Sequence, residues 1–198
     1  MKNVTFLIDL DGTVLDTAIG VIKSMGEIAR RLPEINLRKI LFQSGARFET
    51  LAARIMESKA FSRVPACPGV KEALYMLGSK GSIEFVTASP DSEKAKQNRR
   101  ENMEYLGLGR YTLHFDRFKS DRSELLSSLP EDYILLDDSI TNCNAARKLG
   151  RPAAHIFYWS RQIMPLIQTG RPAKPVKGMT SYERLYDYAY EYCVCKRL

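Results

Sequence analysis

The sequence predicts an open α/β fold, in which buried strands alternate with helices and a ligand site lies where the strands end. Three short, mostly apolar runs, over residues 6–8, 83–86 and 133–136, have the length and composition of strands. Each run is followed at once by polar side chains, and stretches with helical spacing of apolar residues lie between the runs. In open α/β sheets the loops that leave the strand ends form a crevice, so we expect these polar side chains to line a binding site.

The first run ends in two carboxylates, Asp9 and Asp11, which are separated by one residue and followed by Gly12. Two acids at a strand end are costly unless a cation joins them. A hard divalent cation such as Mg²⁺ suits carboxylate oxygens, and phosphate oxygens can complete its coordination shell. Asp before Gly is also common in ordinary turns, and this is the alternative interpretation when the segment is taken alone.

The other two runs end in residues of complementary chemistry. The run over 83–86 is followed by Thr87, Ala88 and Ser89, and the run over 133–136 is followed by Asp137 and Asp138. A strand-end turn stabilised by the hydroxyl is the alternative explanation for Thr87. Three strand-like runs with such ends predict one site that combines acidic and hydroxyl groups.

A family resemblance follows from the order of these motifs. Asp9-Leu10-Asp11-Gly12-Thr13, then Thr87, then a lysine, then Asp137-Asp138, resemble the motifs of the haloacid dehalogenase (HAD) superfamily of phosphotransferases. The resemblance covers roughly residues 4 to 160. It implies a Rossmann-like, three-layer α/β/α core with a parallel sheet, and a Mg²⁺-dependent reaction through an aspartyl-phosphate. Substrate choice is left to variable insertions.

The resemblance assigns different roles to the first two acids. Asp9 matches the family nucleophile, which attacks phosphorus while the metal and backbone N–H groups absorb the charge on the transferring oxygens. Asp11 matches the general acid and base, which protonates the leaving oxygen and then activates water. The dehalogenases that gave the superfamily its name lack an aspartate at this place, whereas phosphatases keep one. Asp11 therefore favours phosphoryl transfer over cleavage of a carbon–halogen bond.

The remaining motifs are expected to hold phosphate and metal. Gly12, the Thr87 hydroxyl and the N–H of Ala88 match groups that hold phosphoryl oxygens, and Gly12 allows close approach because it has no Cβ. Asp138 is expected to bind the metal directly together with Asp9 and Asp11, with Asp137 as its supporting partner. Two roles explain Asn142 equally well: it orients these acids, or it caps the helix that follows.

The lysine of the third motif has three candidates in this sequence: Lys94, Lys96 and Lys119. We prefer Lys119, because it lies just ahead of a helical segment at 123–126 and shortly before the pair of aspartates. An ammonium group there would neutralise the nucleophile and the phosphate together. An exposed surface lysine is the alternative interpretation of this residue.

Residues 17–66 interrupt the alternation, since they contain helical patterns and no convincing strand. The resemblance identifies this segment as a small helical cap of the C1 type, inserted after the first strand, and leaves residues 1–16 and 67–198 as the core domain. Pro68-Gly69 marks the return to the core. Caps of this kind close over the site and select the leaving group. The basic residues of the cap are candidates for contacting substrate, but we favour a surface position for each of them: Arg38, Lys39, Arg47 and Arg54.

Composition indicates one globular domain of ordinary polarity. The 198 residues are 44% hydrophobic and 27% charged, and no apolar run approaches the roughly 20 residues of a membrane span. A cleaved signal peptide would remove the first motif, so we expect a cytoplasmic enzyme without a membrane partner. The four cysteines lack the spacing of a zinc site and are expected to be reduced, and the pattern does not explain Cys193 and Cys195.

The net charge of +7 suits an anionic substrate. The basic residues are spread along the chain, however, and solvated faces account for most of them, including Arg30-Arg31, Arg99-Arg100 and the stretch over 171–177. We therefore expect a Mg²⁺-dependent phosphomonoesterase acting on a small phosphorylated substrate. Nucleoside monophosphates are the first candidates, through a loose similarity to 5′(3′)-deoxyribonucleotidases.

Three alternatives to a nucleotidase stay open. The substrate could be another small phosphorylated metabolite, or the 3′-phosphate end of a nucleic acid. In a different functional class, the protein would be catalytically idle and would bind phosphate compounds or nucleic acid. The sequence does not indicate an oligomeric state.

Overall fold

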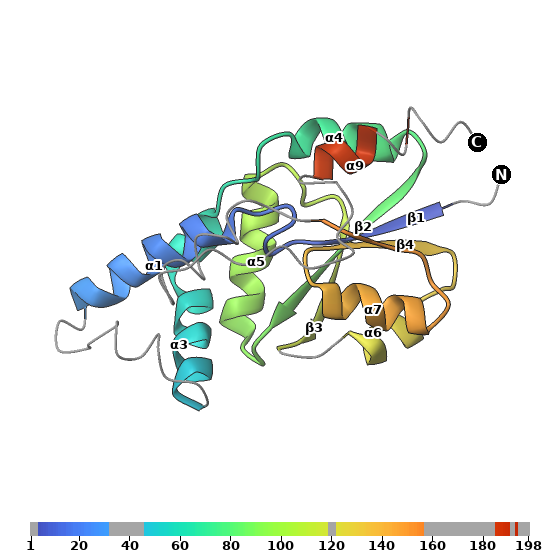
Figure 1. Ribbon diagram of the computed structural model, residues 1–198. Coiled ribbons are helices and arrows are strands. Elements are labelled where there is room, and N and C mark those ends of the chain that lie inside the picture. The colour runs from blue at the N-terminus through green and yellow to red at the C-terminus, as the bar shows by residue number, and fades with distance from the viewer. Residues whose placement is uncertain (1–3, 32–45, 119–121, 157–184, 191–192, 194–198) are drawn as a thin grey trace, which may run out of the picture.

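The structure is a computed structural model that describes residues 4–31, 46–118, 122–156, 185–190 and 193. Within these residues, a five-stranded parallel sheet with the strand order β3-β2-β1-β4-β5 lies between helices (Figure 1). This arrangement confirms the predicted Rossmann-like α/β core. The strands are β1 (Val4–Asp9), β2 (Gly81–Ser89), β3 (Thr112–Arg117), β4 (Tyr133–Asp137) and β5 (Ala153–His155).

Helices cover both faces of the sheet. Figure 1 shows α4 and α9 together on one side of the sheet, and α6 and α7 on the other. The helices are α1 (Thr17–Arg31), α3 (Ala46–Glu57), the 3-10 helix η1 (Lys59–Arg63), α4 (Val70–Gly78), α5 (Glu93–Tyr105), α6 (Ser123–Ser128), α7 (Ile140–Lys148) and α9 (Leu185–Tyr190). None of the described helices is long and apolar enough to span a bilayer.

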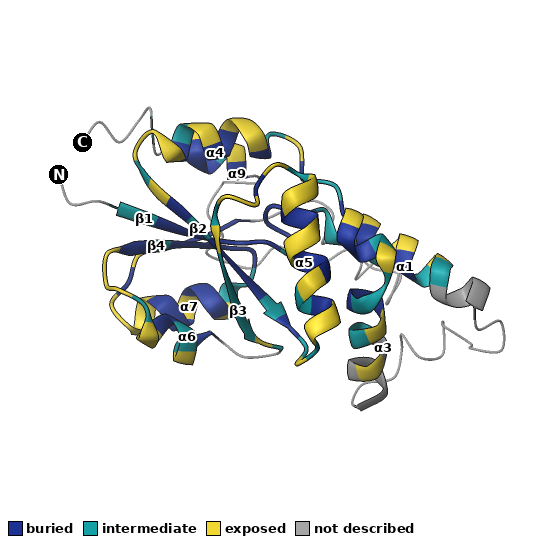
Figure 2. Ribbon diagram, turned by 180° about the vertical axis from the view of Figure 1, so that it is seen from behind, coloured by how far each residue is buried: buried dark blue, intermediate teal, exposed yellow. Residues whose placement is uncertain are grey.

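The apolar core lies on both faces of the sheet because successive side chains along its central strands point to opposite faces. Phe6 and Ile8 of β1 pack with α4 and α5 on one face, and Leu7 packs with α6 and α7 on the other. All three side chains are essentially inaccessible to solvent, and the buried interior runs through the middle of the sheet (Figure 2). A strand buried on both faces shows a continuous apolar run in the sequence, as residues 6–8 do.

Strand register brings the three predicted motif ends together. β1 pairs with β2 on one side, where Asp9 is opposite Val86, and with β4 on the other, where Ile8 is opposite Leu136. Since all three strands are parallel, the residues that follow them emerge at the same edge of the sheet. Residues far apart in sequence, at positions 9, 87 and 137, therefore lie at neighbouring strand ends.

The chain between β1 and α4 contains helices α1, α3 and η1, beyond the carboxyl ends of the strands (Figure 1). The two ends of this segment lie side by side. Leu15 and Ala66 form a β-bridge, and the Cys67 N–H donates to the Val14 carbonyl oxygen over 2.8 Å. α3 and η1 both contact α5. The division into a core and a cap at these residues stays a prediction.

The basic residues predicted for this helical insertion are placed only in part. Arg54 is exposed on α3. Arg38, Lys39 and the side chain of Arg47 lie outside the described residues.

The described cysteines are free thiols: Cys67 and Cys143 are buried, and Cys193 is half-buried. Burial raises the pKa of Cys143 to about 12, so this thiol stays protonated at neutral pH. Cys193 donates to the Met76 carbonyl oxygen over 3.3 Å and joins the end of the chain to α4. Cys195 lies outside the described residues.

The pairing of β1 with β2 requires glycine at position 81. A Cβ there would lie 2.1 Å from the Val4 carbonyl oxygen, a backbone atom that cannot move without disturbing the strand pair. We expect Gly81→Ala to lower the free energy of unfolding by about 1–3 kcal/mol, measured by chemical denaturation. Gly26→Ala is the matched control, because a Cβ in that helix would have no atom within 4 Å and should stabilise the protein by up to about 1 kcal/mol. Equal destabilisation by both changes would contradict this account of the strand pair.

Candidate active site

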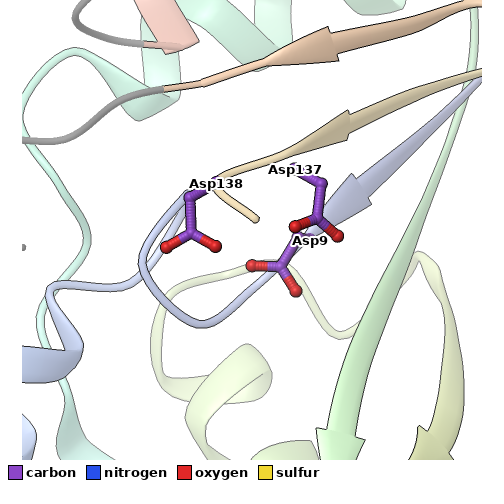
Figure 3. A group of neighbouring side chains, drawn as sticks. All are labelled: Asp9, Asp137 and Asp138. Carbon is purple, nitrogen blue, oxygen red and sulfur yellow. The ribbon is translucent and has the colours of Figure 1, made fainter. Parts of the chain in front are cut away.

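Three aspartates meet at the ends of β1 and β4. Oxygen atoms of Asp9, Asp137 and Asp138 all lie within 4.8 Å of one another (Figure 3). The three residues are 2%, 0% and 3% exposed, respectively. The structure thus brings together the acids of the first and last predicted motifs, from positions nearly 130 residues apart in the chain. We call this set the carboxylate cluster.

Asp137 is fixed by several donors. Its Oδ1 accepts from the Ser139 N–H over 2.7 Å, and the Asn142 side-chain nitrogen lies 3.1 Å and 3.0 Å from its two oxygens. Arg122 Nε lies 3.1 Å from Oδ2. Asn142 is in the first turn of α7 and donates to Asp137, so it orients this acid. Of the two explanations open for Asn142 from sequence, the structure supports orientation.

Asp9 and Asp138 have contacts of their own. Thr13 donates to Asp9 Oδ2 over 3.2 Å, and the Arg122 guanidinium forms an ion pair with Asp9 Oδ1. The backbone carbonyl oxygen of Asp138 lies 2.9 Å from Nε2 of His155, which is on β5. Arg122 therefore contacts two of the three acids of the cluster.

The cluster carries an excess of buried negative charge. Burial raises the pKa of Asp9 well above its ordinary value, Asp137 raises it further, and Arg122 partly opposes both effects. Burial lowers the pKa of Arg122, but its attraction to Asp9 and Asp137 outweighs burial, so the pKa is raised. Three carboxylates beside this guanidinium offer hard oxygen ligands and uncompensated charge, a donor set that fits Mg²⁺.

Asp11 lies apart from this cluster, in a contact network of its own. Thr17 donates to Asp11 Oδ1 over 3.1 Å, and Thr87 donates to Oδ2 over 2.7 Å. The Arg99 guanidinium forms an ion pair with Oδ1. The Asp11 carboxylate is not one of the grouped oxygens, although the sequence predicted it among the metal ligands. Thr87, predicted to bind phosphate, does face this part of the site.

Arg99 corrects the prediction that the Arg99-Arg100 pair belongs to a solvated face. Arg100 is exposed, but Arg99 is fully buried, with 0% of its surface exposed. The buried residues of α5 are Ala95, Asn98, Arg99, Asn102 and Met103, of which three are polar. The search for apolar residues at helical spacing cannot detect such a face, although the i, i+3, i+4, i+7 spacing of these residues was visible.

The predicted third-motif lysine is not placed. Lys119 lies outside the described residues, Lys94 is exposed, and Lys96 pairs with Asp91 and Glu93 at the surface over 3.3 Å and 3.1 Å. Neither described lysine reaches the carboxylate cluster, whereas Arg122, three residues after Lys119, does. Sequence reasoning missed Arg122 because it looked for an ammonium group rather than for any cation in this segment.

Arg122 has an unusual backbone conformation for its residue type. Its φ of 62° lies in the left-handed region, where a non-glycine residue costs roughly 1–2 kcal/mol. It is the residue immediately before α6, so this conformation turns the chain into the helix while the side chain contacts Asp9 and Asp137. Such strain at a charged, buried residue is typical of functional sites.

The turn after β1 requires Gly12 for a similar reason. Its φ of 98° is strained for residues with a Cβ, and its N–H donates to the Leu15 carbonyl oxygen over 3.1 Å. Ala88 follows Thr87 within β2. That Gly12 and the Ala88 N–H bind phosphate stays a prediction.

The sequence matches no protein-family model and no curated protein. Solved structures share its fold. One is the putative HAD-hydrolase YfnB from Bacillus subtilis bound to magnesium, which is 13% identical to this chain. Its superposition has a TM-score of 0.64 and covers 98% of this chain and 100% of the YfnB chain. A putative haloacid dehalogenase-like hydrolase from Burkholderia xenovorans is 18% identical (TM-score 0.58; 94% and 95% covered). The defluorinating L-2-haloacid dehalogenase Rha0230 is 14% identical (TM-score 0.60; 96% and 94% covered). The chain has the fold of HAD-like hydrolases, as its motif order predicted.

A cation bound to the carboxylate cluster should stabilise the folded chain. We expect Mg²⁺ to raise the melting temperature of the wild type, because a ligand that binds only the folded state contributes about 2.7 kcal/mol at a hundredfold excess over Kd. Asp138→Asn should lose most of this rise, since it removes an anionic oxygen from the cluster. Differential scanning fluorimetry with Mg²⁺ or EDTA measures it. The matched control is Asp132→Asn at an exposed position, and an equal Mg²⁺ response in both variants would contradict a metal site here.

The raised pKa of Asp9 makes Mg²⁺ binding depend on pH. Protons and Mg²⁺ compete for the same carboxylates, so binding should release protons and weaken as the pH falls. The weakening should begin well above the ordinary aspartate pKa of 3.8, because burial and Asp137 already favour the protonated form of Asp9. Isothermal titration calorimetry in buffers of different ionisation enthalpy counts the released protons. Asp9→Asn should release fewer, and the same count in both proteins would exclude Asp9 as the titrating group.

Proposed function

We propose that this protein is a Mg²⁺-dependent phosphomonoesterase that works through an aspartyl-phosphate on Asp9. The observation that carries the proposal is the buried carboxylate cluster at the ends of β1 and β4. Its support is the fold, which HAD-like hydrolases share, and the order of the motifs that form the cluster. A structural role alone would not explain three buried carboxylates within 4.8 Å, because their mutual repulsion destabilises the folded chain.

Asp9 and Asp138 would hold the Mg²⁺. Asp137 would support these two acids. Ser139, Asn142 and Arg122 already contact its carboxylate. We leave the Asp11 carboxylate out of the metal site, because Thr17, Thr87 and Arg99 engage it. When bound, the metal supplies positive charge to the oxygens of the transferring phosphoryl group.

In the proposed first step, an oxygen of Asp9 attacks phosphorus, and the bond between phosphorus and the leaving oxygen breaks. Asp11 gives its proton to that oxygen, and an alcohol leaves. In the second step, Asp11 takes a proton from water while the water oxygen attacks phosphorus. The bond between phosphorus and Asp9 then breaks, which releases phosphate and restores the Asp9 carboxylate.

Arg122 takes the role that the sequence analysis gave to Lys119. Its guanidinium contacts Asp9 and is buried, so it can lower the repulsion between the nucleophile and an incoming phosphate. A guanidinium can contact carboxylate and phosphate oxygens at once, because it presents several donors in one plane. Thr87, Gly12 and Ala88 would bind the other phosphoryl oxygens.

Asp11 favours a phosphatase over a haloacid dehalogenase. A halide leaves as a stable anion and needs no proton, whereas an alkoxide leaving from a phosphoester does. The Asp11 carboxylate is 22% exposed and is held by two hydroxyls and a guanidinium, as a residue that must transfer a proton at a defined place would be. The presence of Asp11 therefore supports phosphoester hydrolysis rather than dehalogenation.

For the substrate we propose small phosphorylated metabolites, with nucleoside monophosphates as the first to test. The net charge of +7 supports an anionic substrate. Another small phosphate ester and nucleic-acid 3′-phosphate ends are the alternatives. We further propose that the helical insertion over 17–66 is the cap that selects among them.

Hydrolysis of p-nitrophenyl phosphate tests the proposed function. We expect Mg²⁺-dependent release of p-nitrophenol by the wild type and a loss of at least about a thousandfold in kcat for Asp9→Asn, because the nucleophile is removed. Asp132→Asn, at an exposed position, should retain wild-type activity.

Two further arms sharpen this test. Arg122→Met should lose most of the activity, whereas Arg117→Met, at an exposed position beside Glu124, should keep it. Equal activity of Asp9→Asn and wild type would rule out Asp9 as the nucleophile. A wild type that hydrolyses an L-2-haloacid but no phosphoester would be a dehalogenase, and one inactive on both would favour the idle binding protein.

A further inference from the structure

Arg99 is the largest side chain that the described part of the chain buries completely. Its two terminal nitrogens serve different partners: Nη2 forms the ion pair with Asp11, and Nη1 lies 3.1 Å from Asn102 Oδ1 and 3.4 Å from the Phe61 carbonyl oxygen. The guanidinium carbon also lies 4.0 Å from the centre of the Phe61 ring. Arg99 thus joins three segments: α5, η1 and the loop after β1.

Arg99 belongs to a polar stripe on α5 that holds the segment returning from the helical insertion. Asn98 donates to the carbonyl oxygens of Met56 and Ser58 over 2.8 Å and 3.0 Å, and Asn102 donates to that of Val64 over 2.9 Å. These bonds fix the backbone over 56–64 against α5. In this stripe, Arg99 is the member that also reaches Asp11.

A purely structural explanation of this ion pair is unfavourable. Taking a guanidinium fully out of water costs several kcal/mol, and well-packed apolar side chains of similar volume often stabilise a protein as well or better. The pair does supply a fixed geometry: Arg99 and Thr17 contact one oxygen of Asp11, and Thr87 contacts the other. Thr17 comes from α1 of the insertion and Thr87 from the end of β2, so Asp11 is held between the insertion and the core.

We propose that Arg99 is a positioning residue, which holds the Asp11 carboxylate in the orientation for proton transfer and ties that orientation to the segment returning from the insertion. This inference rests on the proposed function. A rigid fork of donors shared between a carboxylate and a backbone carbonyl restricts the carboxylate more than a single flexible donor can. A misplaced acid loses proton transfer even when substrate binding is intact.

Such a role has a kinetic signature that general loss of structure lacks. The constant kcat/KM reports the steps up to transfer of the phosphoryl group to Asp9. That transfer needs a proton from Asp11 when the leaving group is poor, and needs it far less when the leaving group is a stable anion. Phenyl phosphate and p-nitrophenyl phosphate provide this contrast with nearly the same shape.

We expect Arg99→Met to lower kcat/KM for phenyl phosphate at least about tenfold more than for p-nitrophenyl phosphate. Arg99→Lys keeps a charge but not the fork, so its ratio of the two constants should fall between those of wild type and Arg99→Met. Arg100→Met is the matched control, because Arg100 is the exposed neighbour on the same helix, and its ratio should equal that of the wild type. Circular dichroism checks that each variant is folded.

A double-mutant cycle with Asp11→Asn tests whether Arg99 acts through Asp11. With the acid removed, Arg99→Met should cause no further change in the ratio, whereas an independent, additive change would overturn the proposal. Amide hydrogen exchange supplies a readout that does not depend on activity: the η1 amides should exchange faster in Arg99→Met than in Arg100→Met. Equal exchange would overturn the tie to the insertion.

The failures of the two proposals are distinguishable. A wild type without activity on either ester would remove the proposed function and the catalytic role of Arg99 with it. An active wild type whose ratio is unchanged in Arg99→Met would remove the role of Arg99 alone. If Arg99→Met does not fold, Arg99→Lys decides, and a wild-type ratio in that variant overturns the proposal.

Discussion

The repulsion among three buried carboxylates is the constraint on which the rest of the site depends. Asp9, Asp137 and Asp138 are removed from water at one sheet edge, where the charged forms of neighbouring acids disfavour one another. The surrounding groups offset this cost in part: Arg122 lies against Asp9 and Asp137, and Ser139 and Asn142 also donate to Asp137. The strained backbone of Arg122 is the consequence of delivering a guanidinium there from the residue before a helix.

The two acids of the first motif have different surroundings because β1 ends at Asp9 and the chain turns away from the strand before Asp11. Asp9 continues the face of Leu7, which packs toward α6 and α7, and there it meets Arg122. Asp11 lies past the end of β1, beside Thr87, and there it meets Arg99 from α5. Each acid therefore has its own buried arginine. Two carboxylates placed in unlike environments can serve as nucleophile and as proton donor in one reaction.

The sequence predicted the repeated strand-like runs with polar ends, but not the two buried arginines, whose partners depend on the fold. The mostly apolar runs predicted the strands β1, β2 and β4, because strands buried on both faces are rich in apolar residues along their length. The polar residues after these runs predicted the edge of the sheet where the site lies. Arg99 and Arg122 were missed for physical reasons. A buried polar helix face has no apolar periodicity, and a residue in the left-handed region gives no local signal unless it is glycine. Their partners are decided only by tertiary contacts.

Hydrogen bonds attach the helical insertion to α5, the helix that carries the arginine of Asp11. Backbone carbonyl oxygens of its returning segment accept hydrogen bonds from Asn98 and Asn102. The Phe61 ring of the same segment lies under the Arg99 guanidinium, which contacts Asp11. Since the attachment is built from directional hydrogen bonds rather than apolar contact alone, a shift of this segment must break them or move α5 with it. Under the roles proposed here, the position of the insertion and the orientation of Asp11 are coupled through Arg99, and a substrate that moves the insertion would also act on the proposed proton donor.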